Sequence, residues 1–594
     1  MLIVQKTITV YLHYIKCFKS TIFGASEEYM RNKTTGKELT AMLLCLCLLS
    51  CSADVHLDEH ENETETADTR ETTGEYSLDK PAWADAVSFN KGNTNSVSKN
   101  GKVERTSRAE AVSTMYADSF DDAFGSVETI TVYAEDNAGL PDGYDIKAYK
   151  NEKKGVFYLF LPCRVDKGAV AVRTLHSDGC ETGVYTLNFN SDTNYGVYSG
   201  GIYYDVVAMQ SSVPSLMINV TDGSMKEVNS DASHSTYCCG DMTLTVSDET
   251  AAARGWKTEY RSKENDYSTS GTMKMRGRGN WTWNQQKKPY QLTLEKKTDL
   301  LGMGKAKNYL LLANVMDASL LRDQVLYDLA DDMGLAYTPD IEPVDVFIDG
   351  EYKGSYSLAE KVEVGESRVN IDEDSDFLLE LDHYYMNEQW VAETPRGYHF
   401  TMHNNESYEK LGEIERAMKN IEKAVWKSDT DNWRDVLDED SWVKYWWLQD
   451  LSRNNDTFIG SNYFYYITDE GKLYAGPVWD MDNTFGIWGG GENLMKKGWH
   501  SDDRGWLGKL YSNTSFKDAL EEYYKNGGLR ELFDALPDKV DSYAEYIRES
   551  AEMNYIVNKK QYFVDCGCES WDDDIEYLKD FIRERTEWYT KRIK

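Results

Sequence analysis

The hydrophobic pattern of this chain changes along its length, and this change is the strongest constraint on the fold. From about Val127 to Leu381, apolar and polar residues alternate in short segments, which is typical of β-strands. After about Glu406 the pattern is largely helical, interrupted by one predicted hairpin at 462–478. Because 594 residues are too many for one compact core, the sequence predicts several domains.

The first β-rich stretch, 126–232, predicts a β-sandwich domain. Its segments Thr129–Tyr133, Val156–Leu161 and Leu216–Val220 alternate, and turn-forming clusters such as Asn137-Ala138-Gly139 separate them. About a hundred residues of this kind are typical of an antiparallel sandwich. The stretch contains no group of catalytic residues, so we expect a spacer or an accessory binding module.

Residues 1–51 have the features of a leader and lipoprotein signal peptide. A basic stretch precedes the apolar run Ala41–Leu49, which is too short to span a bilayer. The run ends in Leu-Leu-Ser-Cys, which resembles a bacterial lipobox and predicts lipidation of Cys51. An ordinary signal peptide with an incidental cysteine is the alternative. We expect an exported protein, at the cell surface or in the periplasm, that is lipid-anchored to a bacterial membrane.

The charge of the chain limits its partners. Residues 52–125 are polar and partly acidic, with few apolar residues, and predict a flexible linker. The formal net charge of the whole chain is −36, which argues against a nucleic-acid partner, because phosphate binding needs a basic surface. The same charge favours a basic protein partner, and it leaves the oligomeric state open.

Six cysteines lie beyond the leader, and an exported chain permits disulfides between them. Cys163 and Cys180 lie in one predicted domain and are a candidate pair, although the spacing does not fix the pairing. Cys566-Gly567-Cys568 has no second cysteine or histidine cluster at a usable spacing, so the motif is weak evidence for a metal site.

The remaining region, 233–594, contains two groups of residues that suit a nucleotide. The first is a glycine-rich turn after a predicted strand, Arg276-Gly277-Arg278-Gly279-Asn280-Trp281-Thr282-Trp283. Glycines let backbone N–H groups approach an anion, and arginines add bidentate donors for phosphate. Lys287 and Lys288 begin the next strand, so a lysine can point back toward the same anion. A plain β-hairpin with a polar loop is the alternative.

The second group surrounds the predicted hairpin and consists of Asn455-Asp456, Asn462 and Trp479-Asp480-Met481-Asp482. Closing the hairpin brings Asn462 and Asp480 together at its open end, with Asp456 just before it. Phosphoryl transfer needs one carboxylate to orient the attacking hydroxyl, and an Asn and an Asp to hold divalent metal. Helix caps and solvated loop residues are the alternative.

From the glycine-rich turn to Leu381 the chain predicts strands and a single helix. The helix is expected at 319–333, with Asp317 or Ser319 as its cap and Gly334 at its end. A β-rich part with one helix, followed by a helical part, is the two-lobed plan of a protein kinase, although the order of elements alone only suggests it.

Many separated motifs together resemble the CotH (spore coat protein H) kinase family. They are Arg276 to Trp283, Lys287-Lys288-Pro289-Tyr290, Asp299-Leu300-Leu301-Gly302-Met303-Gly304, Leu311-Leu312-Ala313-Asn314, Ser319-Leu320-Leu321-Arg322, Val344-Asp345-Val346, Glu351-Tyr352-Lys353-Gly354, Ala359-Glu360-Lys361-Val362-Glu363-Val364 and Trp479-Asp480-Met481-Asp482. The resemblance extends from about Gly271 to the C-terminus. It implies a multidomain chain in which the β-sandwich precedes an α+β, two-lobed atypical protein-kinase domain.

The resemblance also implies cofactors and roles. It implies that the chain uses ATP with Mg²⁺ or Mn²⁺ to phosphorylate serine on a protein. This acceptor is expected to be Ser-rich, and the acidic charge of the chain favours a basic one. Asp456 resembles the catalytic aspartate, and Asn462 and Asp480 resemble the metal ligands. Asp482 is either an extra ligand or a helix cap.

The nucleotide-binding candidates come from the glycine-rich turn and from three later strands. They are Arg276, Arg278, Asn280, Trp281, Lys288, Glu360, Glu380 and Asp382. Lys288 resembles the phosphate-pairing lysine, with Lys287 as the alternative. Glu360 either orients that lysine or binds metal, and Glu380 to Asp382 would form the hinge beside adenine.

Two departures separate the chain from ordinary protein kinases. Asp456 and Asn462 are one residue further apart, and the metal motif is Asp-Met-Asp where those kinases have Asp-Phe-Gly. Two other functions compete with an active kinase, because ATP is scarce outside the cytoplasm. One is a catalytically inactive surface structural or adhesion protein with a kinase-like fold, and the other is transfer of AMP from ATP.

Overall fold

The structure is a computed structural model that describes residues 127–181, 183–262, 272–427, 431–488 and 494–593. These residues belong to one compact unit of the chain, Leu78–Lys594. The predicted leader and linker, with Cys51, lie outside the described residues. None of the helices in the described ranges combines the length and the apolar character needed to cross a bilayer.

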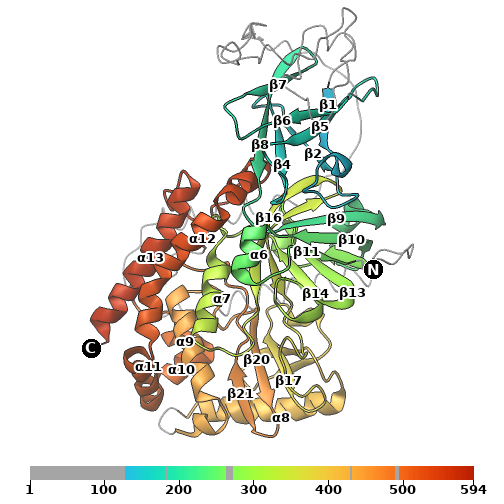
Figure 1. Cartoon of the computed structure of the whole chain (residues 1–594). Helices are drawn as coiled ribbons and strands as arrows, with labels where there is room; N and C mark the ends of the chain where they lie inside the picture. Colours follow the sequence, from blue (N-terminus) through green and yellow to red (C-terminus); the bar gives the residue numbers. More distant parts are fainter. Residues whose placement is uncertain (1–126, 182, 263–271, 428–430, 489–493, 594) are drawn as a thin grey trace, which may run out of the picture. The chain divides into compact units, whose positions relative to one another are not determined.

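Two four-stranded sheets form the first part of the described chain (Figure 1). The first has the order β2-β1-β5-β6 and consists of β1 (Val127–Val132), β2 (Ile146–Lys147), β5 (Val170–His176) and β6 (Tyr185–Leu187). The second has the order β3-β4-β8-β7 and consists of β3 (Tyr149–Asn151), β4 (Val156–Leu161), β7 (Tyr195–Ser199) and β8 (Ile202–Gln210). Apolar side chains of both sheets share one hydrophobic cluster, which we call the accessory core.

The strand directions correct one expectation for these accessory sheets. β4 pairs in parallel with β8, whereas the other strand pairs of the two sheets are antiparallel, as predicted. A parallel pair needs a long crossover connection. The chain between β4 and β8 provides it, because it contains β5, β6 and β7.

The next eight strands form one sheet that closes on itself. They are β9 (Ser215–Asp222), β10 (Tyr237–Thr245), β11 (Glu259–Arg261), β12 (Met273–Gly277), β13 (Tyr290–Asp299), β14 (Lys305–Leu312), β15 (Ile341–Ile348) and β16 (Glu351–Glu360), in the order β11-β10-β12-β13-β14-β16-β15-β9. β9 pairs in parallel with β15 and antiparallel with β10, which makes the sheet barrel-like. Buried side chains such as Met275, Leu292 and Tyr309 form its core, which we call the barrel core.

β9 corrects a second expectation, which places Leu216–Val220 in the sandwich. Leu216 and Ile218 belong to the barrel core, whereas Met217 between them belongs to the accessory core. Successive side chains of a strand point to opposite faces, so β9 contributes side chains to both cores. Alternation identified the strand, but it does not identify the partner strands.

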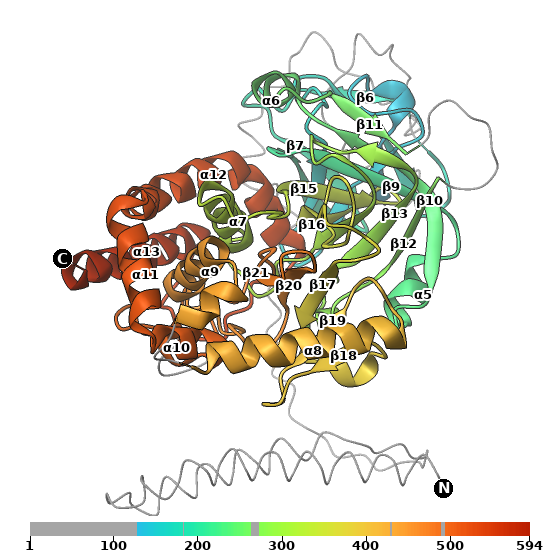
Figure 2. The ribbon, with the colours of Figure 1, turned by 90° about the horizontal axis from the view of Figure 1, so that it is seen from below.

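The described residues contain nine α-helices. They are α5 (Met225–Ser230), α6 (Asp248–Arg254), α7 (Arg322–Asp332), α8 (Tyr408–Val425), α9 (Glu439–Ser452), α10 (Gly505–Tyr511), α11 (Thr514–Asn526), α12 (Leu529–Val557) and α13 (Trp571–Arg592). Short 3-10 helices lie at Ala134–Asp136, Thr282–Asn284, Tyr385–Asn387, Asp431–Asp435 and Ser501–Asp503. The helices from α9 to α13 gather on one side of the strands (Figure 2). The predicted change from a β-rich to a largely helical chain is therefore confirmed in the described part.

α7 begins later than predicted, at Arg322 instead of Ser319. The Asp317 carboxylate accepts hydrogen bonds from the backbone N–H groups of Ser319, at 2.9 Å, and Arg322, at 2.8 Å. It therefore holds the residues before the helix in a turn and satisfies an N–H group that the first helical turn leaves without a partner.

A five-stranded sheet combines three strands that precede α8 with a hairpin that follows α9. It consists of β17 (Phe377–Leu381), β18 (Val391–Glu393), β19 (His399–Met402), β20 (Asn462–Ile467) and β21 (Lys472–Ala475), in the order β18-β19-β17-β20-β21. β20 and β21 are antiparallel, which confirms the predicted hairpin. β21 ends at Ala475 because Pro477 has no N–H group to continue the ladder.

Helix α9 is buried on all sides and anchors the helical part. Its Trp442, Trp446 and Trp447 are almost completely inaccessible to solvent. Near its C-terminal end the Asp450 carboxylate forms a fully buried ion pair with Arg585 of α13, at 2.7 Å. The second carboxylate oxygen of Asp450 accepts hydrogen bonds from the backbone N–H groups of His500 and Ser501. Asp450 therefore fixes the C-terminal end of α9, and the site residues begin directly after this end.

The cysteines correct a third expectation. Cys163 and Cys180 are both free thiols, so the candidate disulfide between them is absent from the described residues. The Sγ atom of Cys163 instead contacts the backbone oxygen of Thr245 in β10, at 3.4 Å. Cys180 is exposed in the turn after β5.

Candidate active site

Four carboxylates gather where the first turn of α7 meets the segment after β21. Asp323 belongs to α7, and its Oδ1 atom accepts a hydrogen bond from the backbone N–H of Met481, at 2.9 Å. Burial raises the pKa of Asp480, and the nearby charge of Asp456 raises it further. Burial also raises the pKa of Asp482 well above its ordinary value, and Asp480 and Asp323 add to this effect. These four side chains, Asp323, Asp456, Asp480 and Asp482, are called the carboxylate cluster below.

Backbone geometry and an asparagine position two members of the cluster. Asp480 has a left-handed backbone, with φ of 59°. The Asn454 amide accepts a hydrogen bond from the Asp456 N–H, at 2.9 Å, and donates one to the Asp480 carbonyl, at 3.2 Å. Asn454 therefore joins the segment after α9 to the segment after β21, which brings Asp456 and Asp480 to one place.

The environment of Asp456 suits a general base. Burial raises the pKa of its carboxyl group, so the carboxylate holds a proton more readily than an exposed aspartate does. Asn483 opposes this effect by donating a hydrogen bond from Nδ2 to Oδ2 of Asp456, at 3.2 Å. The carboxylate is thus both buried and oriented, which a group that accepts a proton during catalysis requires.

Sequence reasoning missed Asn483, which follows Asp482 directly. Within the described part of the chain, its Oδ1 atom is buried and has no hydrogen-bond partner. A buried amide oxygen without a partner is an acceptor available for a ligand or a cation. The signal that could have found this residue was an amide side chain immediately after Asp-Met-Asp.

Sequence reasoning also missed Asp323, which follows the Ser319–Arg322 motif directly. The hydrogen bond that it accepts from Met481 spans 158 residues of sequence. No local pattern indicates such a contact. The only signal was an acidic residue in the first turn of a predicted helix, which is ordinarily explained by the helix dipole.

Asn462 has a different environment from the one predicted. It is the first residue of β20, and its Oδ1 atom accepts a hydrogen bond from the Phe458 N–H, at 2.6 Å. Its Nδ2 atom donates to the Gly460 carbonyl, at 2.9 Å, so both ends of the amide close the loop after Asp456. The hairpin does bring its open end to Asp480, but the side chain that bonds Asp480 there is Ser461.

The two arginines of the glycine-rich turn lie in different environments. Arg278 is half-buried, and its guanidinium lies 5.7 Å from the centre of the Trp479 ring. Burial lowers the pKa of Arg278, and the carboxylate of Asp480 opposes this effect. Arg276 instead donates to the backbone oxygen of His234 and to the side chain of Gln291. Arg278 is therefore the arginine that faces the carboxylate cluster.

The tip of the turn is exposed and aromatic. Gly279 has φ of 85°, and a Cβ atom there would lie only 2.5 Å from Oγ1 of Thr282, so glycine is required. Asn280 is exposed, and its carbonyl accepts a hydrogen bond from Asn284. The Trp281 ring lies 5.8 Å from the ring of Trp488.

Neither candidate lysine reaches Glu360. The Nζ atom of Lys288 donates to the backbone oxygen of Trp283 and lies 4.4 Å from the centre of that ring. Lys287 is buried, and its Nζ atom donates to the backbone oxygen of Ser355. Burial lowers the pKa of Lys287 to about 7.

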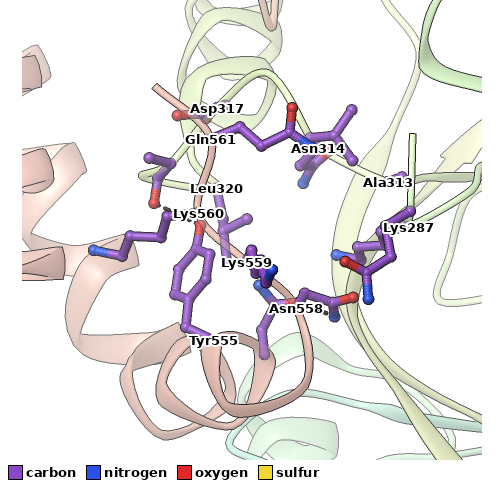
Figure 3. Close-up of a pocket in the computed structure, with 14 residues that line it drawn as sticks. Lys287, Ala313, Asn314, Asp317, Leu320, Tyr555, Asn558, Lys559, Lys560 and Gln561 are labelled. Atoms are coloured by element: carbon purple, nitrogen blue, oxygen red, sulfur yellow. Dashed lines mark hydrogen bonds between the residues drawn. The ribbon is translucent and has the colours of Figure 1, made fainter. Parts of the chain in front are cut away.

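Lys287 and Asn558 both line the cavity that Figure 3 shows. Glu360 pairs instead with Arg368, and both side chains are buried. Burial raises the pKa of Glu360 to about 7, although the charge of Arg368 opposes the shift. In this structure Glu360 therefore pairs with Arg368 and with neither candidate lysine.

Glu380 and Asp382 lie at the end of β17. Glu380 lies opposite Tyr463 of β20, and its carboxylate lies 2.8 Å from Nε2 of His403. Asp382 accepts hydrogen bonds from the Tyr384 N–H, at 2.7 Å, and from the Thr401 hydroxyl, at 3.0 Å. Both carboxylates therefore have partners close to the end of β17.

The comparison with known families agrees with the geometry. The sequence model of the CotH kinase protein family matches residues 275–589, more than half of the chain. The chain therefore belongs to the CotH kinase family, which confirms the resemblance and indicates a kinase-like function with ATP and a divalent metal in general. The search of curated proteins found no match.

Proposed function

We propose that this chain is an ATP- and metal-dependent protein kinase that phosphorylates serine on a basic, Ser-rich protein outside the cytoplasm. The observation that carries the proposal is the carboxylate cluster beside Arg278. Asp456, Asp480 and Asp482 follow one another in the chain order that a protein kinase uses, and a hairpin separates the first from the other two.

The donor set of the cluster fits a hard divalent cation. Burial raises the pKa values of Asp480 and Asp482, and repulsion between the neighbouring carboxylates raises them further. Mg²⁺ and Mn²⁺ prefer carboxylate and carbonyl oxygen ligands. Asp480, Asp482 and the amide oxygen of Asn483 would hold the ion, with Asp323 close by. The bound ion would neutralise charge on the ATP phosphates.

The proposal assigns the proton transfer to Asp456. The serine hydroxyl oxygen forms a bond to the γ-phosphorus of ATP, the bond to the bridging oxygen breaks, and ADP leaves. The hydroxyl proton passes to the Asp456 carboxylate, which the hydrogen bond from Asn483 orients. Arg278, whose guanidinium interacts with the charge of Asp480, supplies positive charge to the phosphates.

A two-lobed arrangement is part of the proposal. The barrel-like sheet with α7 would be the first lobe, and the helices from α8 to α13 with the β20–β21 hairpin would be the second. The support is that Arg278 and Asp323 come from the first part and Asp456, Asp480 and Asp482 from the second. Glu380 to Asp382, which precede the helical part, remain our candidates for the hinge beside adenine.

We also propose the location and the acceptor. A lipid anchor on Cys51 would hold the protein at the outer face of a bacterial membrane, and Cys51→Ala should then release it into the soluble fraction. An acidic chain attracts basic proteins, so the acceptor is expected to be basic. It is expected to be rich in serine because serine is the proposed site of phosphorylation.

Mass spectrometry distinguishes this function from its alternatives. The purified protein is incubated with ATP, Mg²⁺ or Mn²⁺ and a basic Ser-containing protein, and both proteins are weighed. One added phosphate supports the kinase, one added nucleotide supports AMP transfer, and no added mass supports an inactive, ligand-binding protein. Asp480→Asn should abolish the added mass, whereas Asp469→Asn, an exposed aspartate in the turn of the same hairpin, should not.

A further inference from the structure

Two thiols and a carboxylate meet between the last two helices. The Sγ atoms of Cys566 and Cys568 and a carboxylate oxygen of Asp574 all lie within 4.8 Å of one another. In the ranges that the structure describes, no other set of three or more histidine, cysteine or acidic side chains has one ligand atom from each member within 4.8 Å of all the others. The cysteine motif alone was weak evidence for a metal site, and the fold adds the carboxylate that the sequence spacing did not reveal.

Local structure orients all three groups. Gly567 has a left-handed backbone, with φ of 71°, which turns the chain between the two cysteines. Asp574 lies in the first turns of α13 and is only 4% exposed. Its Oδ2 atom accepts hydrogen bonds from Nζ of Lys560, at 2.7 Å, and from the Tyr562 hydroxyl, at 3.1 Å. Partners of this kind fix a carboxylate so that its other oxygen can bind a metal ion.

We propose that Cys566, Cys568 and Asp574 bind a thiophilic divalent cation of the Zn²⁺ class through two thiolates and one carboxylate oxygen. In a tetrahedral zinc site, Zn–S bonds of about 2.3 Å place neighbouring sulfurs roughly 3.8 Å apart, which the present spacing allows. Thiolate ligands select Zn²⁺ over Mg²⁺ and Ca²⁺, so this site takes a different ion from the carboxylate cluster. Three protein ligands leave the fourth position to water.

The site would stabilise one particular connection of the fold. Cys566 and Cys568 lie in the segment between α12 and α13, and this segment also contains Phe563. The Phe563 ring lies 5.4 Å from that of Trp281 and 4.6 Å from that of Trp488. A cation that tied the segment to α13 would therefore also hold the aromatic tip of the glycine-rich turn. The binding itself does not depend on kinase activity.

The experiment measures metal binding by the full-length protein, purified under reducing conditions. Reduction matters because a disulfide between Cys566 and Cys568 would remove two electrons and two protons and destroy the ligand pair. Zn²⁺ is titrated in competition with a chromophoric chelator, and Co²⁺ serves as a spectroscopic probe. Wild type is compared with Cys566→Ser, Cys568→Ser and the double variant. Cys180→Ser, which replaces an exposed thiol elsewhere, is the matched control.

We expect wild type and the Cys180 variant to bind one more equivalent of Zn²⁺ than the double variant. The same two proteins should show thiolate-to-cobalt absorption that the double variant lacks. Loss of a residue that only hydrogen-bonds to a metal ligand weakens metal binding about 10- to 100-fold. Loss of a thiolate ligand itself should therefore weaken binding at least about 100-fold. Zn²⁺ should also raise the melting temperature of wild type and leave that of the double variant unchanged.

Two results would overturn the proposal. One is equal Zn²⁺ binding by the wild type and the double variant. The other is a reduced wild-type protein that binds no Zn²⁺ while its melting curve shows a folded chain. Asp574→Asn adds a separate check, because the amide can still accept hydrogen bonds from Lys560 and Tyr562. Undiminished affinity in this variant would remove Asp574 from the site.

Discussion

Asn483 donates a hydrogen bond from Nδ2 to Oδ2 of Asp456 across 3.2 Å, while its own Oδ1 atom is buried without a partner in the described part of the chain. The Asn483 amide therefore has two roles. Its Nδ2 group orients the candidate base, and its Oδ1 atom is available to bind a cation. This geometry separates the effects that substitutions in the site should have.

Asn483→Ala should lower phosphotransfer by about 10- to 100-fold, because it removes a positioning contact and a cation ligand together. The apparent affinity for Mg²⁺ or Mn²⁺ should fall in parallel, which a purely structural role would not cause. The measurement is initial rate against metal concentration. Asn420→Ala, at an exposed position of α8, is the matched control and should behave as wild type. Unchanged metal dependence in the Asn483 variant would exclude Oδ1 as a ligand.

Asp456→Asn should leave the affinity for ATP nearly intact and reduce kcat by about a hundred- to ten-thousand-fold. The reason is that the carboxylate acts on the hydroxyl proton mainly in the transition state, so kcat should change more than KM. A melting curve on the same sample excludes general damage to the fold. Full activity of this variant would move the role of base to another member of the carboxylate cluster.

Asp480→Ala should abolish metal-dependent ATP binding, because a carboxylate that ligates the phosphate-bound cation is hard to replace. The left-handed backbone of Asp480 makes alanine unfavourable there for a second reason. Asp480→Asn avoids this problem, because asparagine tolerates that conformation while the charge is lost. Calorimetric titration of ATP with and without metal is the measurement. Wild-type affinity in the asparagine variant would remove Asp480 from the site.

His500 should make the protein sensitive to acid. Burial lowers its pKa from an ordinary value of 6.5 to about 4, although Asp450 opposes the shift. The unfolded chain therefore takes up a proton first as the pH falls, so stability is lost between about pH 6.5 and about pH 4 and is fully present above that window. The loss should amount to about 3 kcal/mol in the free energy of unfolding.

Urea unfolding of wild type and His500→Gln over that pH range tests the prediction. Other buried groups also titrate there, and Glu360 shifts stability in the opposite direction because its pKa is raised. The difference between the two proteins isolates His500. This difference should change by about 3 kcal/mol from pH 7 to pH 4, and a constant difference would contradict the assignment.

The sequence predicted those parts of the site that depend on local pattern and chain order. The β20–β21 hairpin followed from alternation and a turn, and closing it placed Asp480 at its open end. Which neighbouring side chain faces that end does not follow from alternation, and Ser461 bonds Asp480 while Asn462 closes the preceding loop.

The parts that could not be predicted are long-range contacts. Asp323 joins the carboxylate cluster through a hydrogen bond across 158 residues, and Lys288 turns back to the nearby Trp283 instead of reaching Glu360. Motifs identify which segments meet, but they do not give the directions of individual side chains. The same limit applies to β9, whose alternation predicted a strand but not its place in the barrel-like sheet.

Because β9 contributes side chains to both cores, it limits where the chain can be divided into stable fragments. A fragment that began at Met275, where the family match starts, would lack β9 and β10 and would expose unpaired main-chain groups of β15 and β12. Open sheet edges of this kind recruit other chains and promote aggregation. Starting just before Ser215 restores the pairing but uncovers Met217, Phe347, Tyr352 and Met553, which the accessory sheets shield from solvent. The accessory sheets therefore cover part of the kinase-family region. Neither the sheets nor that region can be replaced as an independent module.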